Sequence, residues 1–447
     1  MVLAPSLALA ALNATQLRLL CMPDPYIISA LKGDMEMDKA AEQAFRQREQ
    51  RLMDAVQLKT PDRVPISIGL NYHPAKFAKI TTWNAYYDFP TWKQAYIKAA
   101  QFFDPDRLLI VLNQSGNVLE ALDHKQLRWP GHGVSIHHTH QFVEGEYMKE
   151  EEYDLFLNDM SDFLVRCYLP RVYGLLAPAA KLPPLNTLLM ALPFQSLATA
   201  EFADMLEKLT KIARQAVEWQ TQISSLSREL TELGFFCKMP MIGGGAPFDV
   251  ISDFLRGMRG TMLDMYRCPG KLLQACEKQC RIQLDRIAKI PKATEFTPAF
   301  IPLHRGAHGF MSLKQFETFY WPFLKRVVLA LIDAGYTPDL FFEGDYTSRL
   351  EYIAELPAGK AIARFDQCDM ARAKEILGKK VCIAGNMPVS LLQVGTAEDV
   401  KAAVKQLIDV VGKDGGYIMA PASALDEVKP ENLKTMIDFT KEYGRYR

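Results

Sequence analysis

Residues 361–385 read AIARFDQCDMARAKEILGKKVCIAG, and this stretch carries the pattern that decides the fold. Residues 361–365 are a short, largely apolar run, residues 370–377 have the spacing of an amphipathic helix, and residues 381–384 are apolar again. A strand, a helix and a second strand joined by short loops are typical of a βαβ unit, which predicts two parallel strands.

The same alternation continues over most of the chain. Strands are predicted at residues 64–70, 107–112, 235–241, 299–303, 340–343, 361–365, 381–384 and 417–420. Helices are predicted at residues 40–59, 313–334, 346–356, 370–377 and 397–412. Eight such units in 447 residues favour an α/β fold of the (β/α)8 TIM barrel type. The open, doubly wound alternative would need a Gly-x-Gly-x-x-Gly turn after an early strand, and the sequence has none there.

Two parts of the chain fall outside this repeat. Residues 1–39 are predicted to be an extra amino-terminal arm, or in part sequence upstream of a natural start near Met35 or Met37. No basic residue precedes the apolar stretch at 3–12, which disfavours a secretory signal. Residues 40–447 are predicted to be a single barrel domain, in which residues 114–233 form a largely helical insertion or lid after the second strand.

The composition limits the class of partner. Lys and Arg number 52, as do Asp and Glu, and no basic run predicts binding to nucleic acid or to a membrane. The eight scattered cysteines favour reduced thiols in the cytoplasm over a disulfide framework. His132, His137, His138 and His140 favour a surface strand at 134–140 over a metal site, since zinc needs converging ligands. The amino-terminal arm is consistent with a homodimer.

Polar side chains follow the predicted strands, at the end of a barrel where active sites lie. The predicted catalytic residues are Glu343, Asp345 and His304. The predicted substrate-binding residues are Arg305, Asn71, Tyr72, His73, Asp366, Gln367, Asn386 and Ser423. Loops are polar for solubility as well, so each residue also has a structural interpretation.

Glu343-Gly344-Asp345 is the sharpest of these motifs. Two carboxylates beside a glycine turn can share a proton, so that one pKa rises, or they can hold a hard cation. Helix capping by Asp345 is the structural alternative, and it accounts for only one of the two acids. His304 suits an acid, base or metal ligand, and Arg305 suits a carboxylate clamp, with a salt bridge to Glu343 as the alternative.

Several segments together resemble the uroporphyrinogen decarboxylase superfamily, which also contains methylcobamide:coenzyme M methyltransferases and corrinoid-dependent O-demethylase methyltransferases. These segments are Thr60-Pro-Asp-Arg-Val-Pro, Gly245-Ala-Pro-Phe, Phe310-Met-Ser with Phe316 and Trp321-Pro322, Gly385-Asn-Met-Pro, and Lys429-Pro-Glu-Asn-Leu. Each is weak alone, but their order and spacing carry the resemblance from about Arg48 to the end of the chain. The resemblance implies a (β/α)8 barrel.

The sequence departs from two branches of that superfamily. The resemblance implies an arginine-bearing loop that grips the carboxylates of a porphyrinogen, but this chain has Gly69-Leu-Asn-Tyr-His-Pro there, which disfavours haem-pathway decarboxylation. The coenzyme M branch implies a His-x-Cys pair and a later Cys as zinc ligands, where this chain has Glu343, Asp345 and Ser423. A zinc–thiolate site is therefore not expected, and a hard-ligand site at Glu343 and Asp345, or no metal, remains.

What remains of the resemblance implies a methyltransferase that moves a methyl group from a small methoxylated or related donor to a corrinoid carrier protein. The Asp-x-His-x-x-Gly stretch of a corrinoid-binding module is absent from the sequence, so the corrinoid is expected on a partner protein. Glu343 or Asp345 with a raised pKa would protonate the leaving oxygen. A cofactor-free decarboxylase or lyase of a small carboxylate, and a binding barrel without catalysis, stay open as alternatives.

Overall fold

Five parallel strands form the centre of the computed structural model, which describes residues 37–110, 114–189, 195, 197, 199–240 and 242–446. The strands are β6 (Pro298–Leu303), β7 (Thr337–Asp345), β8 (Ile362–Gln367), β9 (Cys382–Gly385) and β10 (Tyr417–Ile418), in the spatial order β10-β9-β8-β7-β6. Each neighbouring pair is parallel, so all five carboxyl ends lie at one edge, called here the carboxyl edge. The predicted α/β class with a parallel sheet is confirmed.

A second parallel pair continues this sheet through backbone hydrogen bonds. It consists of β1 (Ser67–Ile68) and β2 (Arg107–Leu108). Ser67 N donates to the carbonyl of Met419, which follows β10, at 3.0 Å. On the other side, Leu108 N donates to Phe236 O at 3.0 Å, and Phe300 N in β6 donates to Pro240 O at 3.2 Å. Residues 235–240, predicted to be a strand, form only an isolated bridge with β2, yet they lie between β2 and β6.

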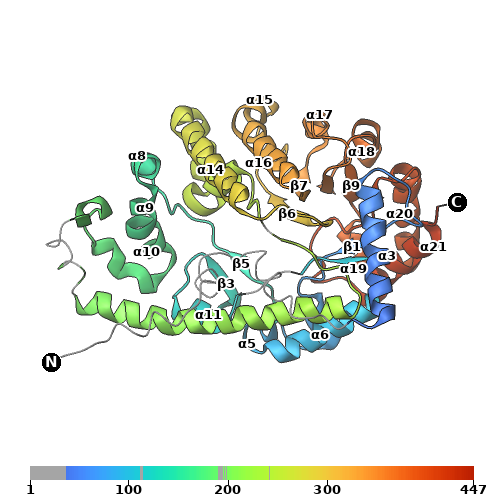
Figure 1. Ribbon diagram of the computed structural model, residues 1–447, viewed down its shortest axis with the longest axis horizontal. Coiled ribbons are helices and arrows are strands. Elements are labelled where there is room, and N and C mark those ends of the chain that lie inside the picture. Colours follow the sequence, from blue (N-terminus) through green and yellow to red (C-terminus); the bar gives the residue numbers. More distant parts are fainter. Residues whose placement is uncertain are drawn as a thin grey trace.

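Helices pack against the outward face of the strands, and Figure 1 shows them as an arc around the centre. The helices after β6 are α15 (Leu313–Gln315), α16 (Trp321–Asp333), α17 (Leu350–Ile353), α18 (Met370–Leu377), α19 (Val389–Val394), α20 (Ala397–Leu407) and α21 (Pro430–Tyr443). Those before it are α12 (Pro247–Val250), α13 (Gly257–Arg267) and α14 (Pro269–Lys289). Leu340 and Phe342 of β7 are fully buried in this layer with Val327 of α16. The predicted helix at 346–356 is shorter than expected, because a 3-10 turn at Thr347–Arg349 precedes α17.

The side chains of each strand point alternately to the outward and the inward face. Helix α3 (Lys39–Val56) covers the amino end of the inward face. Phe45 and Leu52 of α3 pack in a separate cluster with Ile362 of β8 and Cys382 of β9. Successive side chains of a strand point to opposite faces, so these inward residues are the neighbours of outward ones in sequence. Helix α3 therefore covers the amino end and leaves the carboxyl edge to other elements.

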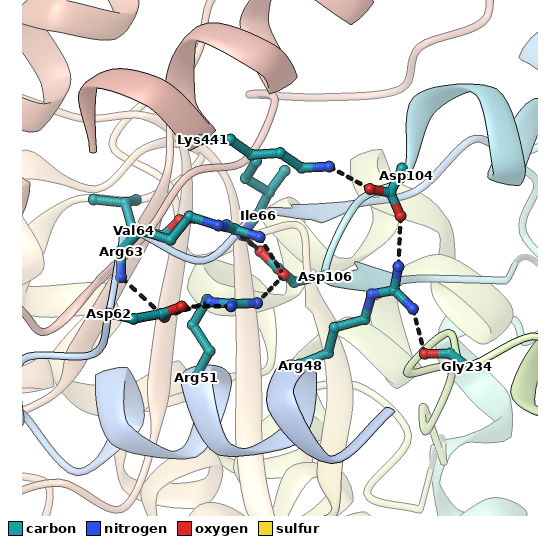
Figure 2. A network of polar contacts seen from close by, with 10 residues as sticks. All are labelled: Arg48, Arg51, Asp62, Arg63, Val64, Ile66, Asp104, Asp106, Gly234 and Lys441. Atoms are coloured by element: carbon teal, nitrogen blue, oxygen red, sulfur yellow. Dashed lines mark hydrogen bonds and ion pairs between the residues drawn. The ribbon is translucent and has the colours of Figure 1, made fainter. Parts of the chain in front are cut away.

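An ion network ties α3 to the loops before β1 and β2 (Figure 2). Asp106, whose side chain is 1% exposed, accepts from Arg51 of α3 at 2.6 Å and from Arg63 at 2.7 and 2.8 Å. It also accepts from the backbone N of Ile66 at 2.8 Å. Arg51 in turn binds both oxygens of Asp62. All of the acceptor sites of this buried carboxylate are therefore used.

Residues 114–233 add helices and a small sheet to the centre. The helices are α7 (Gly116–Ala121), α8 (Tyr153–Asn158), α9 (Met160–Phe163), α10 (Leu169–Val172) and α11 (Ala200–Glu232), and the strands are β3 (Leu127–Pro130), β4 (Gly133–Val134) and β5 (Gln141–Phe142). In Figure 1, α8, α9 and α10 lie to one side of the central strands, and the long α11 runs beside α6 (Phe89–Phe103). The shorter α4 (His73–Ala78) and α5 (Asn84–Tyr87) precede α6.

The surface strand predicted at 134–140 is wrong beyond Val134, where β4 ends. The Thr82 hydroxyl lies within hydrogen-bond distance of the carbonyl oxygens of Ile136 and His138, at 2.6 and 2.7 Å. These carbonyls therefore face Thr82 and not a strand partner. The predicted arm at 1–39 lies outside the described residues as far as residue 36. In the described ranges, no helix has the length and apolar character that crossing a membrane requires.

Candidate active site

Polar side chains of three neighbouring strands share the inward face at the carboxyl edge. The register pairs Pro302 with Phe341 and Phe341 with Arg364. Because side chains alternate along a strand, His304, Glu343 and Asp366 lie two residues further along the same face. Below them, the half-buried rings of Phe300 and Phe341 stack with centroids 6.1 Å apart. The structure therefore brings together three of the residues predicted from the sequence.

His304 has a carboxylate beside each of its two ring nitrogens. The Nε2 atom of His304 is 3.6 Å from Oε1 of Glu343, which is longer than a hydrogen bond. The other ring nitrogen, Nδ1, is 2.6 Å from Oδ2 of Asp253. The carboxylate of Asp253 accepts this hydrogen bond, so Nδ1 carries a proton and Nε2 is the nitrogen that faces Glu343.

Arg305 also lies in the group, and its guanidinium faces two acids. Its Nε donates to Oδ1 of Asp253 at 3.0 Å, and its Nη2 lies 3.6 Å from Glu144 of the insertion. The guanidinium carbon is 5.2 Å from the centroid of the Phe310 ring. A clamp for a substrate carboxylate would have to compete with these two acids.

Sequence reasoning missed two residues of the group, Asp249 and Asp253. Asp249 lies in α12, and Asp253 lies one turn later in the helical segment Ile251–Arg256. Asp249 is 2% exposed, and it accepts from the backbone N of His304 at 2.9 Å, from that of Arg305 at 3.0 Å and from the Tyr320 hydroxyl at 2.7 Å. Two acids at i and i+4 just after the glycine-rich loop at 243–247 were the available signal.

The charges of the group change the pKa of its members. Burial opposes the charge of His304, but the hydrogen bond to Asp253 and the charges of Asp249 and Glu343 outweigh it and raise the pKa of His304 to about 9. Burial and the charge of Asp253 raise the pKa of Asp249 to about 6. Burial raises the pKa of Glu343, against the attraction of His304 and with the repulsion of Asp366. His304 therefore carries a positive charge at neutral pH, as Arg305 does.

Asp345 is turned away from this group. The pairing with β8 shifts by one residue between Phe342 and Asp345, and Gly344 takes a φ of +87° at this bulge. The exposed carboxylate of Asp345 accepts from Thr347 N at 2.8 Å. Burial disfavours its charge, but the hydrogen bonds from Thr347 lower its pKa overall. The side chain thus caps the turn before α17, which is the structural interpretation of this acid.

The other predicted residues have different surroundings. Asp366 accepts from Gly344 N at 3.1 Å, and burial raises its pKa. Asn386 donates to Cys368 O at 3.2 Å next to β8. Gln367 and Ser423 are exposed, and Asn71 is half-buried at a φ of 44°.

Tyr72 and His73 point into the protein beside β1. The Tyr72 hydroxyl is 2.6 Å from that of Tyr86 and 2.8 Å from Nδ1 of His140. His73 is fully buried with its ring centroid 5.5 Å from that of Phe103, and burial lowers the pKa of His73 to about 4. Its ring is therefore a neutral part of the core.

In the part of the chain that the structure describes, no three His, Cys, Asp or Glu side chains are placed to hold a metal ion. The register shift at Gly344 gives Glu343 and Asp345 different neighbours, His304 for Glu343 and Thr347 for Asp345. The cluster of Asp249, Asp253, His304, Arg305 and Glu343, called here the strand-end cluster, is built instead as a network of proton donors and acceptors.

Comparisons with known proteins agree on a family. The family profile described as uroporphyrinogen decarboxylase (URO-D) matches residues 196–443, just over half of the chain. The uroporphyrinogen decarboxylase of Chlorobium phaeovibrioides is 32% identical over 217 residues, which are 46% of this chain and 60% of that protein. That of Chlorobaculum tepidum is 30% identical over the same shares. The alignments thus span less than two thirds of these relatives.

A solved structure extends the likeness over more of the chain. The methyltransferase from Methanosarcina mazei aligns with a TM-score of 0.55 over 89% of this chain and 98% of its own, at 16% sequence identity. At this identity the alignment establishes a shared fold. The alignment covers a larger share of the chain than the sequence matches do, since backbone arrangement outlasts sequence similarity.

Proposed function

The chain belongs to the uroporphyrinogen decarboxylase family, and on this premise we propose that it is a methyltransferase. In this proposal it moves a methyl group from a small methoxylated or related donor to a corrinoid carried by a partner protein. A solved structure that shares its fold is a methyltransferase, from Methanosarcina mazei. The departures of the chain at Glu343, Asp345 and Ser423 support a donor other than coenzyme M, because oxygen ligands do not suit a thiol-activating zinc.

The proposal includes closure of the strands into a (β/α)8 barrel. Each of the eight predicted strand segments has a hydrogen-bonded neighbour on both sides, from β1 and β2 through residues 235–240 to β6 and on to β10. The bond from Ser67 N to Met419 O supports closure of the ring. In such a barrel the carboxyl edge is the end where active sites lie.

The distance of 3.6 Å between Nε2 of His304 and Oε1 of Glu343 carries the chemical proposal. A donor oxygen that lies beside this pair, within hydrogen-bond distance of Nε2, can accept a hydrogen bond from Nε2–H of the charged imidazole. When the O–CH3 bond breaks, the oxygen keeps the electron pair and takes this proton, so the alcohol or phenol leaves neutral. Glu343 faces the same nitrogen, and its charge favours the protonated imidazole that donates. A reduced corrinoid supplies the cobalt nucleophile that receives the methyl group.

The surroundings of the cluster suit the approach of a partner protein. Phe142, Phe254 and Phe310 are exposed, and Phe142 and Phe254 pack edge to face with ring centroids 5.7 Å apart. Phe254 follows Asp253 in sequence, and Phe310 lies under Arg305. Exposed apolar side chains next to a reactive group favour a docking surface over plain solvent contact. These residues would border the corrinoid and its carrier.

Decarboxylation of a small carboxylate is the second candidate, because the curated relatives are uroporphyrinogen decarboxylases. Two observations weigh against it. Arg305 faces Asp253 and Glu144, so a substrate carboxylate would have to compete with these two acids for it. The family match begins at residue 196, so it does not include the loop Gly69-Leu-Asn-Tyr-His-Pro, where porphyrinogen-binding arginines are expected.

The test is transfer to free cobalamin. Purified protein is mixed with chemically reduced cobalamin and a panel of methyl aryl and alkyl ethers, and formation of methylcobalamin is followed by its absorbance. We expect transfer from at least one ether, with a loss of about 100-fold or more in H304Q. The exposed His137 provides the matched control, H137Q, which should keep the wild-type rate. Release of carbon dioxide from a carboxylate, with no transfer from any ether, would replace methyl transfer by the second candidate.

A further inference from the structure

We propose that Asp253 is the positioning residue of this site, which holds the ring of His304 with Nδ1 protonated and Nε2–H directed at Glu343. The inference rests on the proposed function, in which His304 gives a proton to the leaving group. Its test, however, observes the imidazole itself, so the two can fail separately. Asp253 touches neither the donor nor the acceptor in this proposal and acts through His304.

The two oxygens of Asp253 have different partners. Oδ2 is 2.6 Å from Nδ1 of His304, and Oδ1 accepts from Nε of Arg305 at 3.0 Å. A carboxylate that is only 7% exposed and bridges an imidazole and a guanidinium is held in one orientation. It accepts hydrogen bonds and does not donate them, so it selects the form of His304 that has a proton on Nδ1.

Asp249 fixes the backbone of the same strand end. It precedes Asp253 by four residues, so both carboxylates lie on the same side of one helical stretch. Its oxygens accept the backbone N–H groups of His304 and Arg305. The Tyr320 hydroxyl, from the segment Phe316–Tyr320, donates to Asp249 and holds it from behind. One short helix therefore fixes both the backbone and the ring of His304.

The charges around the ring explain why it carries two protons. Asp253 and Asp249 face it from the helical stretch after residue 246, and Glu343 faces it from β7. Arg305 is adjacent in sequence, and its charge is balanced by the same Asp253. Loss of the Asp253 charge in D253N removes the strongest of the attractive contributions and leaves the shape of the side chain. The ring should then titrate about 2 pH units lower, near the ordinary value for histidine.

The experiment is a pH titration of the full chain, labelled at histidine and followed by nuclear magnetic resonance. The chain has eight histidines, and the signals of His304 are identified as those missing in H304Q. We expect both ring nitrogens of His304 to be protonated at pH 7.5 in the wild type, and a neutral ring at that pH in D253N. The control is E144Q, because Glu144 contacts Arg305 and not the imidazole. It should leave the titration of His304 unchanged.

Three outcomes overturn the inference: a neutral His304 in the wild type at pH 7.5, an Nε2–H tautomer above its pKa, or a D253N titration equal to that of the wild type. The first two need no variant, so they decide the matter even when D253N does not fold. When the ring behaves as expected but no methyl donor is found, the positioning role stands and the proposed reaction falls. When transfer depends on His304 but its ring is neutral, only the positioning role falls.

Discussion

Strand β7 carries one acid near its amino end and one near its carboxyl end, and their surroundings shift the two pKa values in opposite directions. Asp339, near the amino end, is 0% exposed and lies between Arg107 at 2.6 Å and Arg364 at 3.0 Å. Burial opposes its charge, yet the two guanidinium groups lower its pKa. Glu343, four residues later, is half-buried, and its pKa is raised by burial. Two arginines balance the charge of Asp339, whereas burial makes the charge of Glu343 unfavourable.

The difference separates stability from chemistry. At the amino end, Asp339 and Asp106 each have two arginine partners, which balance the buried negative charge. At the carboxyl edge, burial outweighs the attraction of the cations near Glu343, which are His304 at 3.6 Å and Arg305. Groups whose pKa is displaced toward neutrality suit proton transfer, whereas fully paired groups hold elements together.

The largest effect is expected from D339N at the amino end. The amide leaves the charges of Arg107 and Arg364 buried without their counter-ion, which costs about 3–5 kcal/mol of unfolding free energy. Urea denaturation followed by circular dichroism measures the loss. The exposed pair Arg372–Glu351 provides the control, since R372A should cost about 1 kcal/mol or less. A loss in D339N as small as that in R372A would contradict the role given to the amino end.

The reverse pattern is expected for E343Q at the carboxyl edge. Under the proposed function, the rate of methyl transfer falls about 100-fold, because the carboxylate that faces Nε2 of His304 and favours its charged, proton-donating form is lost. The unfolding free energy at neutral pH does not fall, since the amide removes a carboxylate that burial disfavours. Rates with reduced cobalamin and denaturation curves of the same samples test both parts. A destabilised E343Q with full activity would reverse the comparison.

The two ends also predict opposite pH dependence of stability. The folded-state pKa of Asp339 lies below its unfolded value of 3.8, so its contribution is present above that pH and is lost as the pH falls toward the folded pKa. The stability gap between wild type and D339N should therefore narrow below about pH 4. The folded-state pKa of Glu343 is raised above 4.5, so its contribution is lost as the pH rises through the folded value. The unfolding free energy of E343Q should therefore increase relative to that of the wild type as the pH rises through the folded-state pKa of Glu343.

Denaturation midpoints between pH 3 and 8 measure both trends. D366N provides a second test at the carboxyl edge, because burial also raises the pKa of Asp366. It should follow E343Q and not D339N. If the denaturation midpoints of D339N, E343Q and D366N changed with pH by the same amount relative to the wild type, the surroundings of the acids at the two ends would not differ in their effect on the pKa.

The sequence is enough to predict the elements but not all of the site. Short apolar runs between amphipathic helices located β6 to β10 and therefore the edge where His304 and Glu343 lie. Asp249 and Asp253 were not predicted as site residues because they lie in helical segments, where an acid is expected to face solvent. The burial of both depends on the packing of α12 against the end of β6, which strand periodicity does not encode.

The direction of the Asp345 side chain was not predictable from the sequence for a different reason. At two residues from Glu343 in a regular strand, it would share the inward face. The bulge at Gly344 breaks the alternation, and the carboxylate turns to Thr347. A glycine between two acids indicated flexibility of the backbone, but the direction of the turn depends on the register with β8.

The smallest effect is expected from D345A, which separates the two acids of the motif. Loss of the hydrogen bond to Thr347 N removes a cap, and this costs about 1 kcal/mol of unfolding free energy. Because Asp345 is turned from His304 by the bulge, the rate of methyl transfer should fall far less than in E343Q. D345N, whose side-chain oxygen can still accept from Thr347, should recover most of the stability. A rate loss in D345A that matches E343Q would return Asp345 to the catalytic pair and make the bulge a means of aiming it.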